Sequence, residues 1–293
     1  MNHSATTPFF LGLSTLSSVM NTSTLPPDLG AQSDDDARRR IIAILRERCP
    51  AGFMSTEKLD KIAKLTPVRR KSIAALAAAF PGSLNIQDLD GRTPLAWLVR
   101  YDEPALIRQF LELGANPRGA ADLSLHGIHP LGQACELRHG PALEAIATAA
   151  GLDDILVAVD SDYSSNELPC SGARALFMAA MNTNIRGMAT LLALGADPKA
   201  LTVHGDTPMH ALAIFKKNPP RALPCAELLA GDFPDMILAE NNAGLTPAAL
   251  AASYDSPMAA PLLAMEEARR LFLAEADALP AGSKNERPSA PRL

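Results

Sequence analysis

The sequence has few aromatic residues and few cysteines. One tryptophan, three tyrosines and four cysteines are present among 293 residues. Cys49, Cys135, Cys170 and Cys225 are scattered without any Cys-x-x-Cys spacing. This pattern favours a reduced intracellular protein whose cysteines pack in its core over a disulfide-bonded one.

Long apolar runs and basic blocks are also missing. No segment approaches the ~20 apolar residues of a transmembrane helix, and the best one, 8–20, is interrupted by Ser and Thr. The first Lys or Arg is Arg38, so a conventional secretion signal, which needs basic residues before its apolar core, is not expected. The net charge is −5. We therefore expect neither a membrane span nor a nucleic-acid partner.

What the sequence does contain is a repeated helix start. Gly91–Leu95, Gly205–Met209 and Gly244–Ala248 each place a Thr-Pro pair two residues after a glycine. Threonine is a good N-cap acceptor, and proline suits the first helical position because its missing N–H has no partner there anyway. A helix start that recurs along one chain indicates stacked helical units.

Two degenerate copies, Gly127–Leu131 and Gly172–Leu176, fill the gap between the first and second clear ones. The five glycines are 36, 45, 33 and 39 residues apart, and Gly-Ala-Asn/Asp-Pro turns at 114–117 and 195–198 follow two of them by 23 residues. Period and motif together resemble ankyrin repeats. His210 completes the Thr-Pro-Leu-His element of that family, with methionine in place of leucine.

The resemblance covers about residues 84–278 and implies an all-α ankyrin-repeat solenoid of five helix-turn-helix units. Residues 37–83 are predicted to form an N-terminal helical cap, built from helices at 56–65 and 67–80, and a further helix is expected over 36–47. A long last helix is expected over 261–278, followed by a disordered tail, 279–293. Two insertions, 152–171 and 216–221, lengthen loops, with either a functional or a neutral role.

The resemblance also implies that loop tips and the exposed ends of the inner helices line one concave face that binds a protein. The position ten residues after each glycine falls on this face, and aromatic side chains there suit an interface. Packing of the same side chains into the core is the alternative. Trp97 lies at a different position, where the family has a buried leucine, and we expect it in the core. The predicted protein-binding residues are Tyr101, Leu137, Phe215, Tyr254, Arg100, Met181, Ile214, Asp90, Arg92, His126, His204 and Asp206.

The sequence gives little support for catalysis or for a metal. His126, His129, Cys135 and His139 are possible zinc ligands, but the repeat register spreads them over a loop, a helix and the following turn. Cys170 lies at a loop tip with no histidine or basic residue placed beside it. We expect no cofactor, no metal and no enzymatic activity.

Residues 1–36 differ in composition from the rest, being rich in Ser and Thr and poor in charge. Such a segment is expected to be disordered, and it is either a flexible tail or an export signal similar to those of bacterial type III secretion effectors. The expected function is a monomeric scaffold that binds another protein, located in the producing cell's cytoplasm or secreted into a host cytosol. The alternative is an adaptor or enzyme whose N-terminal helical segment carries a separate activity, for example ubiquitin-ligase recruitment.

Overall fold

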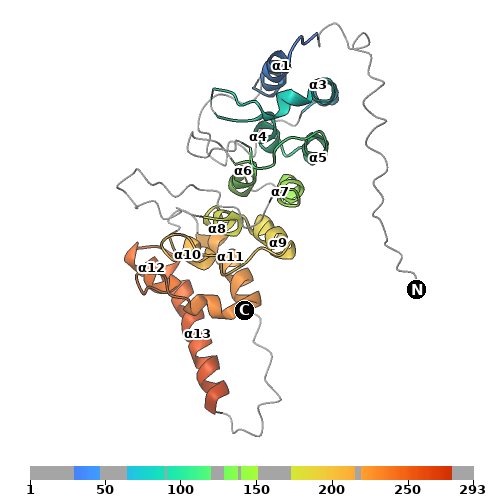
Figure 1. Cartoon of the computed structure of the whole chain (residues 1–293). Helices are drawn as coiled ribbons and strands as arrows, with labels where there is room; N and C mark the ends of the chain where they lie inside the picture. Colours follow the sequence, from blue (N-terminus) through green and yellow to red (C-terminus); the bar gives the residue numbers. More distant parts are fainter. Residues whose placement is uncertain are drawn as a thin grey trace, which may run out of the picture.

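The computed structural model describes residues 30–46, 65–89, 91–119, 129–137, 140–150, 173–214 and 219–278. Within these ranges the secondary structure is helical, with no strand, as the sequence predicts (Figure 1). Predictions that concern residues 1–29, the helix over 56–65, the two insertions and the tail after 278 lie outside the described residues. The helices are α1(Asp34–Arg46), α3(Pro67–Ala79), α4(Pro94–Val99), α5(Pro104–Glu112), α6(Pro130–Leu137), α7(Gly140–Ala147), α8(Ala175–Met181), α9(Ile185–Ala193), α10(Pro208–Ala213), α11(Pro219–Asp232), α12(Pro247–Ser253) and α13(Ala259–Ala278), with short 3-10 helices η3(Pro81–Asn85) and η5(Pro234–Leu238).

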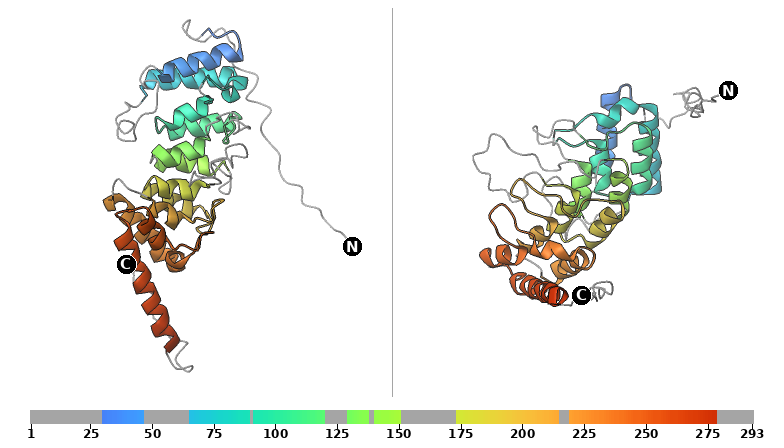
Figure 2. Two further views of the ribbon diagram at one scale, coloured as in Figure 1. Left: turned by 90° about the vertical axis from the view of Figure 1, so that its left-hand side faces the viewer. Right: turned by 60° about the horizontal axis from the view of Figure 1, so that its bottom comes forward.

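The helices are arranged in two stacked rows (Figure 2). The inner row runs α4, α6, α8, α10 and α12, and each helix packs against the next in this order. The outer row runs α5, α7, α9, α11 and α13 in the same way. Because each unit packs mainly on its neighbours, the core is a continuous apolar layer along the array. The C-terminal part of α13 projects beyond the array (Figure 2, left).

Helices α1 and α3 extend the two rows at the N-terminal end. α1 packs against α4 of the inner row, and α3 packs against α5 of the outer row. The helix expected over 36–47 corresponds to α1, which lies beside α4, whereas residues 56–64 of the other expected cap helix lie outside the described residues. The position of α1 matters for the site, because α1 covers side chains that the sequence alone left facing solvent.

The Thr-Pro helix starts have the geometry that the sequence predicts. The hydroxyls of Thr93, Thr207 and Thr246 accept hydrogen bonds from the backbone N–H three residues on, at 3.4, 3.4 and 3.3 Å. In the degenerate third unit Arg174 is at the N-cap position and makes no side-chain cap bond. The helix of that unit therefore begins with the same extended N-cap backbone as the Thr-Pro starts, but without a capping hydroxyl.

The glycines that precede the clear helix starts have left-handed backbone angles. φ is +72° at Gly91, +77° at Gly205 and +71° at Gly244. This region is open to glycine and costly for residues with a Cβ. At Gly205 a side chain would also collide with the backbone nitrogen of Asn242 in the next loop, 2.8 Å from the position of a Cβ. Glycine is required here both for the turn and for the close approach of two loops.

Polar contacts between neighbouring units recur at the turn that joins inner and outer helices. Glu103 accepts two hydrogen bonds of 2.8 Å from the guanidinium of Arg70 on α3. Two units later, Asn184 donates from its side chain to the carbonyl of Cys135, at 3.2 Å. Both residues follow their unit's glycine by twelve positions. The Glu103–Arg70 pair therefore joins the first repeat to α3, as Asn184 joins its own repeat to the preceding one.

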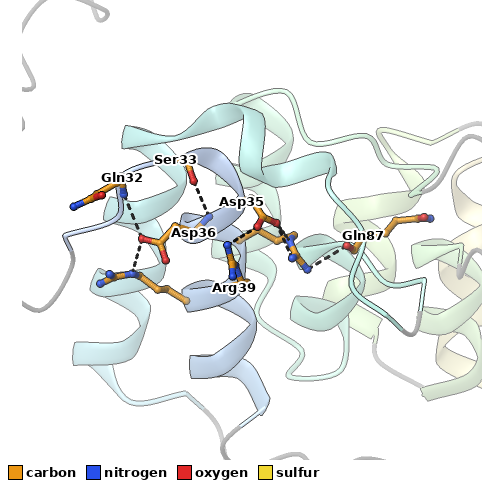
Figure 3. Close-up of polar contacts among 8 residues, drawn as sticks. Gln32, Ser33, Asp35, Asp36, Arg39 and Gln87 are labelled. Carbon is orange, nitrogen blue, oxygen red and sulfur yellow. Dashed lines mark hydrogen bonds and ion pairs between the residues drawn. The ribbon is translucent and has the colours of Figure 1, made fainter.

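The start of α1 is fixed by a polar network (Figure 3). Ser33 Oγ accepts from the N–H of Asp36 at 3.2 Å, as an N-cap residue does. Asp35 pairs with both Arg38 and Arg39 at 2.7 Å. Arg38 also donates to the carbonyl of Gln87 at 3.2 Å, which ties α1 to the loop that leads into the first repeat.

Candidate functional site: the face formed by inner helices and loop tips

The predicted row of exposed residues is partly buried. Tyr101 is only 4% exposed, and its hydroxyl donates to the carbonyl of Leu45 on α1. Leu137 is buried to the same extent. The prediction that these two side chains face solvent was wrong, for Tyr101 because α1 lies over it. Tyr254, in contrast, is 42% exposed at the end of α12, and Phe215 lies outside the described residues.

The neighbouring predicted positions also differ in exposure. Arg100 is 7% exposed, so it is a buried residue rather than part of a solvated rim. Met181 and Ile214, which follow the same register, are half-buried. Among the described residues, the helix ends of this face therefore offer little apolar surface except at Tyr254.

The predicted loop-tip residues fall into two groups. Arg92 and His204 are half-buried. Asp206 is buried and accepts a 2.8 Å hydrogen bond from the side chain of Asn241 in the next loop, so it joins two loops and was wrongly predicted as an exposed contact residue. Asp90 and His126 lie outside the described residues.

Exposed apolar side chains lie instead at the loop tips. Leu89 is fully exposed two residues before Gly91, and Val203 is exposed at the matching position before Gly205. Leu201 in the same loop is also exposed. Leu89 was expected among the loop-tip residues of this face, whereas the prediction of binding residues omitted Leu201 and Val203. The signal that could have found them is an apolar residue in a turn where polar residues are the usual choice.

The second of these loops is held in place by the loop that follows it. Asn242 donates from its backbone to the carbonyl of His204 and from its side chain to the carbonyl of Val203, both at 3.0 Å. Val203 is therefore presented on a loop that is already ordered, which reduces the conformational entropy lost when a partner binds.

His210 lies beneath this loop pair and is fully buried. Its Nε2 lies 2.9 Å from the carbonyl of Leu245, and its Nδ1 accepts from the N–H of Thr207 at 3.2 Å. Since a carbonyl only accepts, the neutral ring carries its proton on Nε2. Burial lowers the pKa of His210 below its ordinary value, and the Leu245 carbonyl and Asp206 oppose this shift. The ring is thus a neutral structural link between two units.

At the N-terminal end of the face, charged residues gather around Trp97. The ring is buried, 1% exposed, as expected for a core residue, and its Nε1 donates to Asp88 at 2.8 Å. The guanidinium carbons of Arg46, Arg92 and Arg100 lie 5.2, 5.2 and 5.6 Å from the ring centroid, within cation–π range. No local sequence pattern predicts this cluster, because Arg46 is distant from Trp97 along the chain.

The residues considered for metal binding or catalysis are engaged in structural contacts where they are described. His129 Nδ1 accepts from the N–H of Leu131 at 3.2 Å, and the Cys135 thiol donates to the carbonyl of Ala175 at 3.4 Å. Burial raises the pKa of the Cys135 thiol far above its ordinary value, which disfavours a thiolate nucleophile. The described parts of the chain hold no group of three or more His, Cys, Asp or Glu side chains arranged to bind a metal. His126, His139 and Cys170 lie outside them.

No helix in the described residues combines the length and the hydropathy required to cross a bilayer.

Two rows of paired helices, Thr-Pro caps and left-handed glycine turns define the ankyrin-repeat fold. In agreement, the chain is similar to the crystal structure of the human ASB11 ankyrin repeat domain, with a TM-score of 0.52 and 19% sequence identity over 80% of this chain and 97% of that one. A scan against protein-family models finds no match, and a search of curated proteins finds none either. At this level of identity the likeness establishes the fold.

Proposed function

We propose that this protein is a scaffold that binds a partner protein through the face formed by its inner helices and loop tips. The observation that carries the proposal is the set of exposed apolar side chains on this face at Leu89, Leu201, Val203 and Tyr254. Burying a large apolar side chain stabilises a complex by about 1.5–3 kcal/mol. Tyrosine is in addition enriched among the residues that dominate interfaces.

A binding role rather than a catalytic one is supported by the state of the reactive side chains. His210 is buried and bonded at both ring nitrogens, and the buried Cys135 thiol has a raised pKa. Neither side chain is presented to a substrate. We therefore propose that function lies in the surface of the solenoid.

The test is a triple substitution, Leu201→Ser, Val203→Ser and Tyr254→Ser. The wild-type chain and the variant are each used to capture proteins from a eukaryotic cell lysate. The amounts of the proteins that the wild type captures, measured by quantitative mass spectrometry, are expected to be at least tenfold lower with the variant. The physical reason is loss of the apolar area that a partner would cover.

The matched control replaces three exposed apolar residues of the outer helices, Val68→Ser, Ile185→Ser and Leu194→Ser. It is expected to keep the wild-type set of captured proteins. Equal thermal unfolding of both variants shows that folding is intact. If both variants capture the same proteins as the wild type, the proposed face does not bind them.

We further propose that the partner is a host protein and that the chain is a bacterial effector delivered into a host cytosol. The support is the composition of residues 1–36, which are rich in Ser and Thr and contain no Lys or Arg. A reporter fused to residues 1–50 is expected to leave bacteria that have a type III apparatus and to remain inside a mutant lacking it. Retention in both strains contradicts the export role.

The alternative, a separate activity in the N-terminal helical segment, is disfavoured by the packing of that segment. α1 and α3 lie against α4 and α5 and continue the helix rows, and the Arg70–Glu103 pair crosses the junction. A segment that completes the solenoid in this way supports a capping role. Removal of the segment separates the two possibilities, because only a cap is needed for the repeats to fold.

A further inference from the structure

Three arginines from separate parts of the chain converge on the ring of Trp97. Arg46 is the last residue of α1, Arg92 precedes α4, and Arg100 follows it. Their guanidinium carbons lie between 5.2 and 5.6 Å from the ring centroid. Like charges repel, so a convergence of this kind needs a compensating interaction.

The carboxylate of Asp88 supplies part of that compensation, but its oxygens already have several donors. Oδ2 accepts from Trp97 Nε1 at 2.8 Å and lies 3.5 Å from Arg46 Nη2. Oδ1 accepts from the backbone N–H of Arg92 at 3.0 Å. Asp88 therefore positions the loop and the indole as well as facing Arg46.

Glu136, on α6, is the other carboxylate near the cluster among the described residues. Although its side chain is exposed, the surrounding protein raises its pKa, and the charges of Arg100 and Arg92 oppose this shift. Asp88 and Glu136 are therefore the carboxylates of the described residues that act on this cluster, and Arg46 and Arg92 have further partners as well.

Arg100 shows where an additional anionic group would be accepted. It is 7% exposed, and its Nε has no hydrogen-bond partner. A buried cationic donor without a partner is destabilising in the free protein, because it has lost water and gained no acceptor. Arg46, with 37% of its side chain exposed, provides contact with solvent at the same cluster.

We propose that the cluster of Arg46, Arg92 and Arg100 around Trp97 is a recognition site for an acidic side chain in a peptide segment of the bound partner. Guanidinium groups bind carboxylates with paired, charge-assisted hydrogen bonds. This inference rests on the proposed binding function. It adds that the N-terminal end of the face binds an acidic segment of the partner. The apolar loop tips near the other end then contact a different part of the same partner.

The test uses Trp97 as a built-in reporter, because it is the only tryptophan of the chain. The full-length protein is titrated with a short peptide of alternating glutamate and alanine while tryptophan fluorescence is recorded. The same peptide with glutamine in place of glutamate is the probe control. We expect saturable binding of the acidic peptide, at least tenfold tighter than that of the neutral one, and weaker binding as NaCl rises from about 0.05 to about 0.5 M.

Arg100→Gln is expected to lower affinity for the acidic peptide at least fivefold. Arg108→Gln, the same change at an exposed position on α5, is expected to leave it unchanged. If Arg100→Gln unfolds the protein, the salt dependence and the comparison of the two peptides in the wild type still decide the matter. Equal binding of both peptides, or tighter binding of a single-stranded oligothymidylate, overturns the proposal.

The test of the acidic specificity and the test of the scaffold function can fail independently. Loss of captured proteins in the loop-tip variant, together with no preference for the acidic peptide, leaves the scaffold function standing and refutes the acidic specificity. If the loop-tip variant and its control capture the same proteins and the acidic peptide also fails to bind, both ideas fail.

Discussion

Removal of residues 1–80 is expected to unfold the first repeat and to abolish the wild-type unfolding transition. The deleted segment includes Ile41, Leu45, Ile73 and Leu76, each fully buried in the core shared with the first repeat. Four such side chains contribute about 6–12 kcal/mol, at about 1.5–3 kcal/mol each. A domain is stable by about 5–15 kcal/mol in total, so this loss is comparable to the whole.

Circular dichroism and Trp97 fluorescence measure the effect. We expect loss of helical signal beyond that of the deleted helices, and a red-shifted emission because Trp97 becomes exposed to water. Deletion of residues 1–29, which leaves α1 and α3 in place, is the control. If the chain lacking 1–80 keeps the wild-type melting temperature and a buried Trp97, the N-terminal segment is an independent module, and the adaptor alternative becomes the better account.

Replacing His210 with alanine is expected to destabilise the protein by about 3 kcal/mol. The change leaves the buried Thr207 N–H without an acceptor, which costs about 1–3 kcal/mol, and removes the hydrogen bond from the ring to the Leu245 carbonyl, which contributes about 0.5–1.5 kcal/mol. The Leu245 carbonyl keeps its other hydrogen bond, from the N–H of Asn241 at 3.1 Å. Urea unfolding followed by circular dichroism measures the difference, which corresponds to a melting temperature lower by roughly 6–12 °C. Asn242→Ala, which removes a hydrogen bond to Val203 from the exposed Asn242, is the milder comparison.

The same histidine predicts a pH dependence. Burial lowers the folded-state pKa of His210 below the ordinary value of 6.5, so below pH 6.5 the unfolded chain binds a proton that the folded one does not. Its contribution to stability is therefore complete above pH 6.5 and is lost as the pH falls from 6.5 toward the lowered pKa. Between pH 7.5 and pH 5.5, the free energy of unfolding of the wild type is expected to fall by more than that of the His210→Gln variant. An equal loss in both proteins assigns the pH effect to other groups.

Local sequence signals predicted the fold well because their physics is local. A threonine hydroxyl caps an N–H three residues away, and a glycine permits a left-handed turn at its own position. The starts of α4, α10 and α12 follow from these two facts. Burial of Trp97 was also predictable, since its register position points into the helix layer.

Exposure on the binding face was less predictable, because it depends on segments that are distant in the sequence. Tyr101 and Tyr254 occupy the same position of their repeats, yet one is 4% and the other 42% exposed. α1 accounts for the difference, since the Tyr101 hydroxyl donates to the carbonyl of Leu45. The interpretation of Tyr101 as an interface anchor failed for this reason.

The sequence by itself determined that this chain forms stacked helix pairs, because each unit has its own caps and turns. The tertiary structure alone decided which face residues remain available to a partner and which charges meet. Asp206 is used to join two loops, and Arg46 reaches the ring of Trp97 from another helix. Such contacts depend on the packing of one unit on the next, where no local pattern specifies which side chains touch.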